Sequence, residues 1–185
     1  MATIFTHPLV PVAIAMVLGQ KRIPKPLWQA GMVAAVVPDF DCASFILKIP
    51  YESQFGHRGF MHSFVFAAAF AALWAWRNME FKVDGETPKR WVIFAYIFAC
   101  TSSHGILDAF TDGGQGVAFF WPFTAERYVF PARPLLVSPI GQSFFSDYGL
   151  AVFLAELKLV WLPCLLIGML GVGVRKMLEK RTAAK

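Results

Sequence analysis

Residues 149–174 read GLAVFLAELKLVWLPCLLIGMLGVGV, and this stretch decides the class of fold. An isolated helix needs about 20 apolar residues to cross the hydrocarbon core of a bilayer, and this stretch is longer than that. Only Glu156 and Lys158 interrupt it with a charge, and a basic tail follows. The whole chain agrees, because 57% of its 185 residues are hydrophobic and only 16% are charged. Soluble domains carry about 25% charged residues, so we predict an integral membrane protein.

Four shorter apolar stretches precede the long one, at residues 8–19, 27–37, 63–76 and 91–107. Stretches this short are typical of buried or re-entrant helices. With residues 149–174 they predict an all-α fold, a polytopic membrane helical bundle of about five transmembrane or membrane-embedded helices in a single domain, 1–185. Residues 111–148 are rich in glycine and proline. We expect this segment to be a long extracytoplasmic loop that covers the functional site.

The basic residues lie beside the apolar stretches in three groups, within residues 21–25, 77–90 and 175–185. Cytoplasmic loops of membrane proteins are enriched in Lys and Arg, so these groups, with twelve of the seventeen Lys and Arg residues, predict the cytoplasmic side. The C-terminus is then cytoplasmic, and all four histidines fall near the outer ends of the helices. A nucleic-acid binder more often carries a continuous basic face. We therefore expect membrane lipids as partners and no nucleic acid.

Two pairs of residues in the outer halves of the predicted helices have spacings that suit a metal ion. His104 and Asp108 are four positions apart and share one face of a helix. They could instead satisfy a polar helix end through a His–Asp hydrogen bond. Asp39 and Asp41 follow Pro38 and cannot share a helical face, but they can converge on a hard metal from a turn. Their alternative is a helix cap followed by a solvated turn.

The segment FGHRGFMHSF, residues 55–64, holds two of the four histidines. On a straight helix His57 and His62 would diverge by about 140°. We expect His57 in a loop, a bend at Gly59, and His62 in the first turn of the following helix. Arg58 carries the planar guanidinium that binds a carboxylate or a phosphate bidentately. An interfacial helix cap with a snorkelling arginine is the alternative.

Together these residues predict a divalent metal site near the outer ends of the first four helices. Ionisable groups in a membrane are costly and mark candidate functional sites, and imidazole with carboxylate suits zinc or manganese. The candidate metal ligands are His7, Asp39, Asp41, His57, His62, His104 and Asp108. Seven ligands exceed the need of one tetrahedral zinc. We therefore expect one or two ions, with the remaining residues supporting the ligands or acting as a base.

Further residues complete the predicted site. A carboxylate that the metal does not need, Asp41 or Glu156, is the candidate catalytic base. Arg58, Arg127 and Arg133 are candidates for binding an anionic group of the substrate. Anchoring of the long loop at the membrane interface is an equal alternative for Arg127 and Arg133.

The motifs also form an ordered series along nearly the whole chain. The series is THP at 6–8, PDFD at 38–41, HRGFMHS at 57–63, HGILDAFTDGG at 104–114, WPF at 121–123, RPLLVSP at 133–139 and AELKLVWLP at 155–163. It resembles the YdjM-like family of bacterial inner-membrane proteins that are described as metal-dependent hydrolases. The resemblance implies a multi-helix membrane protein with a divalent-metal hydrolase activity.

The leading hypothesis is a membrane-embedded metal-dependent hydrolase with its site toward the extracytoplasmic side of the bacterial inner membrane. A His/Asp-bound metal would activate water against an anionic substrate, such as a lipid or lipid-linked phosphoester. One alternative is a metal transporter or metal-sensing membrane protein, although transport predicts polar groups through the full membrane depth. A second alternative is a non-catalytic structural membrane protein whose polar cluster locks its helices together.

Overall fold

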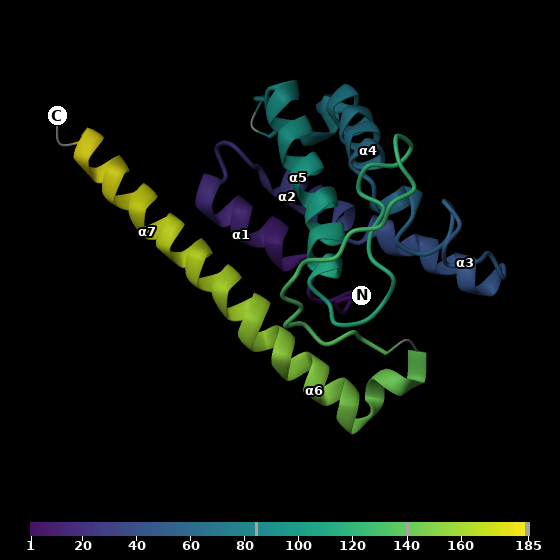
Figure 1. Ribbon diagram of the computed structural model, residues 1–185. Coiled ribbons are helices and arrows are strands. Elements are labelled where there is room, and N and C mark those ends of the chain that lie inside the picture. The colour runs from purple at the N-terminus through teal and green to yellow at the C-terminus, as the bar shows by residue number, and fades with distance from the viewer. Residues whose placement is uncertain (84, 140, 184–185) are drawn as a thin grey trace.

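The computed structural model describes residues 1–83, 85–139 and 141–183, and in these ranges the regular structure is helical (Figure 1). Pairing of β type is confined there to isolated bridges such as that between Thr111 and Leu135. The predicted all-α class is therefore confirmed. The α-helices are α1 (Leu9–Leu18), α2 (Lys25–Ala34), α3 (Ala43–Ile46), α4 (Phe64–Trp76), α5 (Arg90–Ala109), α6 (Asp147–Glu156) and α7 (Leu162–Ala183). Between them lie the short helical segments η1 (Val37–Cys42), η2 (Phe60–His62), η3 (Asn78–Phe81), η4 (Gly141–Phe145) and η5 (Leu157–Trp161).

Prolines set both ends of α2 and explain why it differs from the expected span of 27–37. Pro24 precedes the helix and Pro26 lies in its first turn, where the missing N–H would have no intrahelical partner anyway. Pro38 cannot donate to the carbonyl of Ala34, so the α-helix stops there. The chain continues as the 3-10 helix η1 and then α3. The PDFD motif, residues 38–41, therefore lies in the 3-10 helix that follows this break.

The core lies between α4, α5 and α2. Ala71 and Ala75 are buried one turn apart on α4, and they pack with Ile93 and Ile97 of α5. Small side chains on facing helices let the two backbones approach closely, which is the usual way membrane helices associate. This packing fixes α5, which carries two of the predicted ligands.

The last helical region runs without interruption from Asp147 to Ala183, and its middle is the π-helical turn η5. Pro163 follows this turn and cannot donate the usual i to i−4 hydrogen bond, which accounts for the widened turn next to it. The region lies along one side of the molecule and packs on α1 (Figure 1). A Cβ on Gly168 would lie 2.8 Å from Met16 Sδ, so the helices meet where α7 has no side chain.

Among the described residues, two helices are long and apolar enough to cross a membrane, Arg90–Ala109 and Asp147–Ala183. The shorter apolar helices α1 and α4 do not reach that length, so a bundle with five full spans is not confirmed. The region Asp147–Ala183 is largely unburied within the chain, and its large apolar side chains, such as Leu166 and Leu170, are exposed. Surfaces of this kind call for lipid or a partner helix rather than water.

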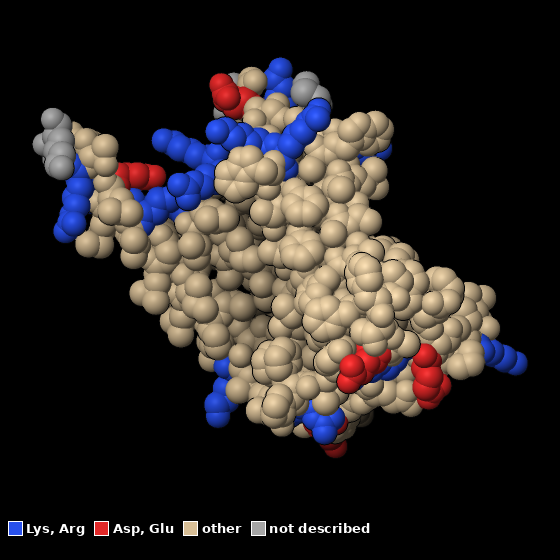
Figure 2. Space-filling view, turned by 45° about the horizontal axis from the view of Figure 1, so that its top comes forward, with Lys and Arg blue, Asp and Glu red and all other residues tan. Residues whose placement is uncertain are grey.

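Charged and ionisable residues are divided between the two ends of the helices. The helix α1 follows His7 and ends before Lys21, and α5 begins at Arg90 and ends just past Asp108. The chain therefore places basic residues at one end of these helices and the His/Asp residues at the other. Figure 2 shows Lys and Arg side chains gathered over one end of the molecule. The loop after α5 packs at the opposite end, where Ala118 N–H donates to Arg58 O at 3.0 Å.

Candidate metal centre

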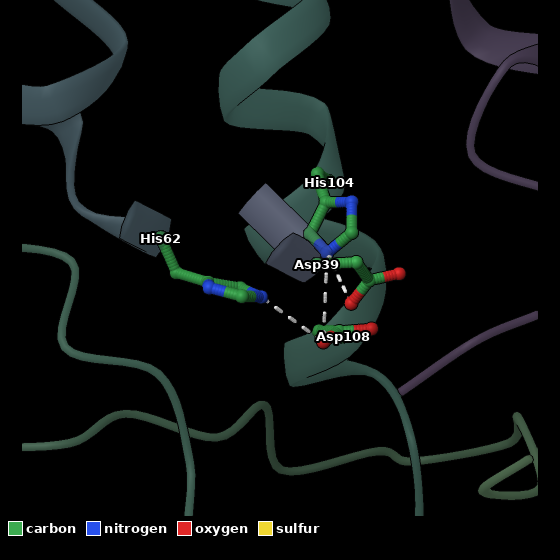
Figure 3. Close-up of side chains that lie close together, drawn as sticks. All are labelled: Asp39, His62, His104 and Asp108. Carbon is green, nitrogen blue, oxygen red and sulfur yellow. Dashed lines mark ion pairs between the residues drawn. The ribbon is translucent and has the colours of Figure 1, made fainter. Parts of the chain in front are cut away.

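Asp39, His62, His104 and Asp108 bring one side-chain ligand atom each to within 4.8 Å of one another (Figure 3). They come from three separate elements: α5 carries His104 and Asp108, η1 carries Asp39, and η2 carries His62. All four side chains are buried, and the most exposed of the four residues, Asp39, is only 6% accessible. Residues distant in sequence thus form one compact polar cluster at the end of the helix core.

Local structure explains how these residues reach the cluster. On α5, the i, i+4 spacing brings His104 Nε2 to 3.9 Å from Asp108 Oδ2. His62 lies in η2 just before α4, not in the first turn of that helix as expected. The reason is Ser63, whose hydroxyl accepts a hydrogen bond from Phe66 N–H at 3.1 Å and caps the helix one residue after His62.

The nitrogen and oxygen atoms of the four residues face one another. His104 Nε2 is 3.3 Å from Asp39 Oδ1, and His62 Nε2 is 3.5 Å from Asp108 Oδ2. The other nitrogen of each ring also lies near a protein oxygen. His104 Nδ1 is 2.7 Å from Ala35 O, within hydrogen-bond geometry, and His62 Nδ1 is 2.9 Å from Asp41 Oδ2 but outside that geometry. A carbonyl oxygen can only accept, so Nδ1 of His104 carries the proton and its Nε2 keeps a free lone pair. This arrangement, with Nδ1 held and Nε2 free, is typical of metal-binding histidines.

Several buried polar atoms in and beside the cluster have no hydrogen-bond partner within the described part of the chain. They include both nitrogens of His7, both carboxylate oxygens of Asp39, and Nε2 of His62 and of His104. A buried polar atom without a partner costs about 1–3 kcal/mol, more if it is charged. So many of them in one cluster fit a cation, and imidazole with carboxylate suits zinc or manganese.

His7 lies against the same cluster. Its ring stacks on that of His104 with the centroids 3.7 Å apart, and its Nε2 is 3.7 Å from Asp108 Oδ1. Burial, together with the nearby His104 ring, lowers the pKa of His7 to about 3. The imidazole is therefore neutral at physiological pH and keeps a lone pair available for a metal.

Asp41 points to the other side of His62 and forms a second group with His57. Its two oxygens lie 2.6 Å from His57 Nδ1 and 2.9 Å from His62 Nδ1, and the second oxygen also accepts from Arg58 N–H at 3.0 Å. Burial opposes ionisation of Asp41, but His57 and His62 outweigh it and hold the carboxyl pKa at about 2. Asp39 thus pairs most closely with His104, and Asp41 with His57 and His62, although Asp39 also brings an oxygen to within 4.8 Å of ligand atoms of Cys42 and His57.

The charge of His62 follows from the carboxylates on either side of the ring. Burial favours the neutral imidazole, but contact with Asp108 and Asp41 outweighs it and raises the pKa of His62 to about 9. Without a metal, His62 therefore carries a proton at neutral pH. A metal that binds at Nε2 must displace it.

Arg58 is the buried cation of the site, 1% exposed. Its guanidinium donates to Asp108 Oδ2 at 3.1 Å, to Thr111 Oγ1 at 2.9 Å and to the carbonyl of Gly113 at 3.0 Å. Its backbone is left-handed, with φ of 61°, a conformation that costs a non-glycine residue about 1–2 kcal/mol. A Cβ on Gly114 would lie 2.5 Å from Arg58 Nη1, so only glycine leaves room for the guanidinium. Arg58 is thus built into the support of Asp108.

Two further predicted site residues are held by other parts of the chain. Arg127 donates to the carbonyl oxygens of Tyr51 at 2.7 Å and of His57 at 3.0 Å, and lies over the Tyr51 ring. Arg133 is exposed and donates to Asp112 O at a long 3.4 Å. The structure therefore does not bring either arginine to the four-residue cluster.

Glu156 is fully buried and contacts the turn before α1. It accepts from Thr3 N–H at 2.6 Å, from the Thr3 hydroxyl, and from the Thr6 hydroxyl at 2.7 Å. Trp161 Nε1–H in turn donates to Thr6 Oγ1 at 2.8 Å. These bonds hold the turn that precedes His7 and that also donates Ala2 N–H to Asp108 Oδ1 at 2.9 Å.

Sequence reasoning missed the residues that orient the ligands. They are Thr3 and Thr6, the carbonyl of Ala35, and Thr111 beside Arg58. Thr6 and Thr111 each lie within a motif that the sequence does single out, THP and HGILDAFTDGG, but nothing in those motifs marked them as supports of the ligands. The Ala35 carbonyl has no sequence signal, because any residue supplies a backbone oxygen.

The fold and the cluster together define a class: an all-helical membrane protein with a buried His/Asp site. The family model described as "YdjM inner membrane protein" matches residues 1–180, and the chain belongs to this family. The resemblance seen in the motifs is thereby confirmed. The chain is also 40% identical over 174 residues to "Inner membrane protein YbcI" of Escherichia coli (strain K12), covering 92% of this chain and 97% of that one. No solved structure matches significantly. Family and relative support an inner-membrane location.

Proposed function

We propose that the protein is a membrane-embedded hydrolase that uses a divalent metal held by Asp39, His62, His104 and Asp108. The observation that carries the proposal is the convergence of four buried ligand atoms at one point. Those of Asp39, His62 and His104 have no hydrogen-bond partner among the described residues. His7 stacks on His104 and offers a further ligand. A bound divalent metal would supply Lewis acidity, which lowers the pKa of water and polarises the bond to be cleaved.

The protein's own proton acceptor in this proposal is His57 rather than a carboxylate. Asp41 Oδ1 is 2.6 Å from His57 Nδ1, and a carboxylate with a pKa of about 2 is ionised and can only accept. Asp41 thus fixes the proton on Nδ1 and leaves Nε2 of His57 to take a proton, as in other histidine–aspartate pairs. Glu156 is not needed as a base, because its oxygens already accept from Thr3 and Thr6.

The substrate would reach the site from an apolar pocket. A cavity of about 220 Å³ borders Asp41 and is lined mainly by apolar side chains, among them Leu47, Phe60 and Phe66. A pocket of this kind suits an acyl or prenyl group, which supports a lipid or lipid-linked phosphoester as substrate. Arg58 and Arg127 are engaged with protein oxygens, so of the three predicted anion-binding arginines only Arg133 keeps most of its donors available.

Metal counting with matched variants tests the proposal. Purified protein is loaded with Zn²⁺ or Mn²⁺, freed of excess metal and analysed by elemental mass spectrometry. We expect close to stoichiometric metal in the wild type, a loss in Asp39→Asn and His104→Ala, and no change in Asp112→Asn, an aspartate of the same end outside the cluster. Hydrolysis is then measured with bis-p-nitrophenyl phosphate and with phosphatidylglycerol in mixed micelles. Absence of bound metal under all loading conditions overturns the proposal.

One observation favours a second function, a structural metal site that locks the helices. All four candidate ligands are at most 6% exposed, and closed coordination is typical of structural rather than catalytic metal sites. A protein that binds metal, loses thermal stability on chelation and hydrolyses neither phosphoester would support this second function. Hydrolysis that Asp39→Asn abolishes would support the first.

A further inference from the structure

A second site of different chemistry lies at the opposite end of α5 from the metal cluster. A cavity of about 1080 Å³ opens between the C-terminal end of α1, the loop that follows it, and the first half of α5. The helix α5 has 20 residues and is therefore about 30 Å long, so this cavity and Asp108 lie near opposite ends of it. The volume is at the upper end of that of ordinary ligand pockets.

The wall of the cavity is apolar. Ile14 and Leu18 of α1 face it from one side, and Val92, Ala95 and Ala99 of α5 face it from the other. Ala95 and Ala99 lie one turn apart on one side of α5, so small side chains form this part of the wall. We call the apolar space between α1 and α5 the channel, and its wall suits a long, flexible apolar chain better than a compact polar ligand.

The rim of the cavity is basic. Lys21, Arg22 and Lys89 line it and are exposed, and Glu86 is the one carboxylate among its described lining residues. Within the described ranges, no hydrogen bond or ion pair engages the three cationic side chains, which leaves them available to an anion. Figure 2 shows Lys and Arg gathered at this end of the molecule, above a hollow in the uncharged surface. Trp91, 68% exposed, also borders the cavity and has the amphipathic ring that settles at a bilayer interface.

We propose that this cavity binds one anionic diacyl phospholipid, with the headgroup phosphate on Lys21, Arg22 and Lys89 and an acyl chain in the channel between α1 and α5. Charge complementarity at the rim and the apolar wall together select an anionic amphiphile. A soluble anion would leave the wall unused, and a lipid without net negative charge would leave most of the positive charge of the rim uncompensated. The inference does not depend on the proposed hydrolase, because none of the cavity residues belongs to the metal cluster.

Native mass spectrometry of the delipidated protein tests this. The protein is treated with EDTA, so that no metal-dependent turnover occurs, and is then titrated with dioleoyl phosphatidylglycerol or dioleoyl phosphatidylcholine. We expect one tightly retained phosphatidylglycerol and much weaker retention of phosphatidylcholine. The triple variant Lys21→Gln, Arg22→Gln, Lys89→Gln should bind phosphatidylglycerol roughly 100-fold more weakly, since each cation near an anionic lipid contributes about a fivefold gain.

Two control variants distinguish specific binding in the cavity from non-specific electrostatic attraction of the lipid to the protein. The variant Lys176→Gln, Lys180→Gln, Arg181→Gln removes the same charge from α7 outside the cavity and should bind as the wild type does. Ala99→Trp keeps the rim but fills the channel, and it should lose the lipid even if the triple variant fails to fold. Equal retention of phosphatidylcholine, an unchanged Ala99→Trp variant, an equal loss in the α7 variant, or full displacement by glycerol phosphate would each overturn the proposal.

Discussion

A proton and a metal ion compete for the imidazole ring of His62. Its two ring nitrogens face Asp41 and Asp108, and these carboxylates raise its pKa to about 9. A metal at Nε2 requires the ring to lose this proton, so metal binding releases a proton at any pH below about 9. The carboxylates that attract the metal therefore also make its binding dependent on pH.

We expect the metal affinity of the protein to rise with pH up to about 9. One proton released per metal bound gives roughly a tenfold tighter apparent Kd for each pH unit between 7 and 9. Competition with a chelator of known affinity, at pH 7, 8 and 8.5, measures this slope. The His62→Ala variant should bind weakly and with a flatter slope. An affinity of the wild type that does not change with pH would contradict the assignment of His62.

The metal-free protein should lose stability over the same range, with the sign set by the direction of the shift. The pKa of His62 is raised, so its contribution to stability is complete below pH 6.5 and disappears as the pH rises through about 9. The pKa of Asp41 is lowered, so its contribution is complete above pH 3.8 and disappears as the pH falls through about 2. Thermal unfolding in detergent with EDTA should show a Tm that falls from pH 7 to 9.

Asp41 and Asp39 should differ in the size of their effect on metal affinity. Asp39 offers two unpartnered oxygens to the metal, whereas Asp41 holds the rings of His57 and His62 from behind. Removal of such a supporting carboxylate typically weakens a metal site by 10–100-fold. We expect the metal affinity to fall by an amount in that range in Asp41→Asn and by more in Asp39→Asn, measured by the same chelator competition. A stronger loss in Asp41→Asn would make Asp41 a direct ligand.

At the scale of elements, the contact between α6 and the first turn of the chain is a long-range link that holds the turn before His7. Glu156 accepts three hydrogen bonds from Thr3 and Thr6, and His7 follows this turn directly. The π-helical turn η5 begins at the next residue, Leu157, and insertions of this kind are frequent next to functional sites. A supporting role and a catalytic role for Glu156 lead to different results.

Replacing Glu156 by Ala should destabilise the protein by about 3 kcal/mol, since it leaves buried donors of Thr3 and Thr6 without an acceptor. Unfolding followed by circular dichroism in detergent measures this loss. Metal bound at saturation should stay near the wild-type level, because the four cluster residues are untouched. Thr6→Val removes one of the same bonds and should cost less. An Ala variant of unchanged stability and no hydrolysis would instead identify Glu156 as a base.

The contact between α1 and α7 depends on glycine. A Cβ on Gly168 or Gly171 would lie within 2.6–2.8 Å of Met16 or Val17. Gly168→Leu should therefore separate the helices and cost about 1–3 kcal/mol. Gly173→Leu, where a Cβ meets nothing within 4 Å, is the matched control and should be neutral in the same unfolding assay. Equal losses in both variants would argue against close packing at Gly168.

Some elements are predictable from sequence because their signal is local. The apolar stretches at 8–19, 63–76, 91–107 and 149–174 each coincide with helix in the structure. The proximity of His104 and Asp108 is also predictable, because helical spacing alone brings the two side chains together. The helix from Lys25 ends before residue 37, although Pro38 was recognisable as a break.

Other features are set by tertiary contacts that leave no local signal. Arg58 looks equally suited to a substrate phosphate and to a carboxylate, and only the fold shows that it meets Asp108. Glu156 in an apolar helix demands a partner, but sequence does not reveal that the partners are Thr3 and Thr6. Which ring nitrogen of His104 is free depends on a backbone carbonyl 69 positions away.

At the scale of the whole molecule, the ordered ends of the helices predict how the chain lies in the membrane. Basic residues flank the ends of α1 and α5 that are remote from the His/Asp cluster. The positive-inside rule predicts that this end is cytoplasmic and that the His/Asp cluster lies toward the other side. This orientation also places the proposed lipid cavity in the leaflet that is rich in anionic lipids.

Cysteine labelling in spheroplasts should show this orientation. In a background without Cys42, Cys100 and Cys164, Glu126→Cys in the long loop should react with a membrane-impermeant maleimide in intact spheroplasts. Lys176→Cys in α7 should react only after permeabilisation. The reverse pattern would place the metal cluster on the cytoplasmic side.

The bonds between Glu156 and the first turn also set an order of biogenesis. They join residues 153 positions apart, so Thr3 has to wait for a residue that is synthesised much later. Asp39, His62, His104 and Asp108 are all synthesised before α6, and they can come together while translation continues. The turn that carries His7 gains its acceptor only when α6 arrives. We therefore expect the four-residue cluster to assemble first and the turn before His7 to become fixed only when α6 packs against it.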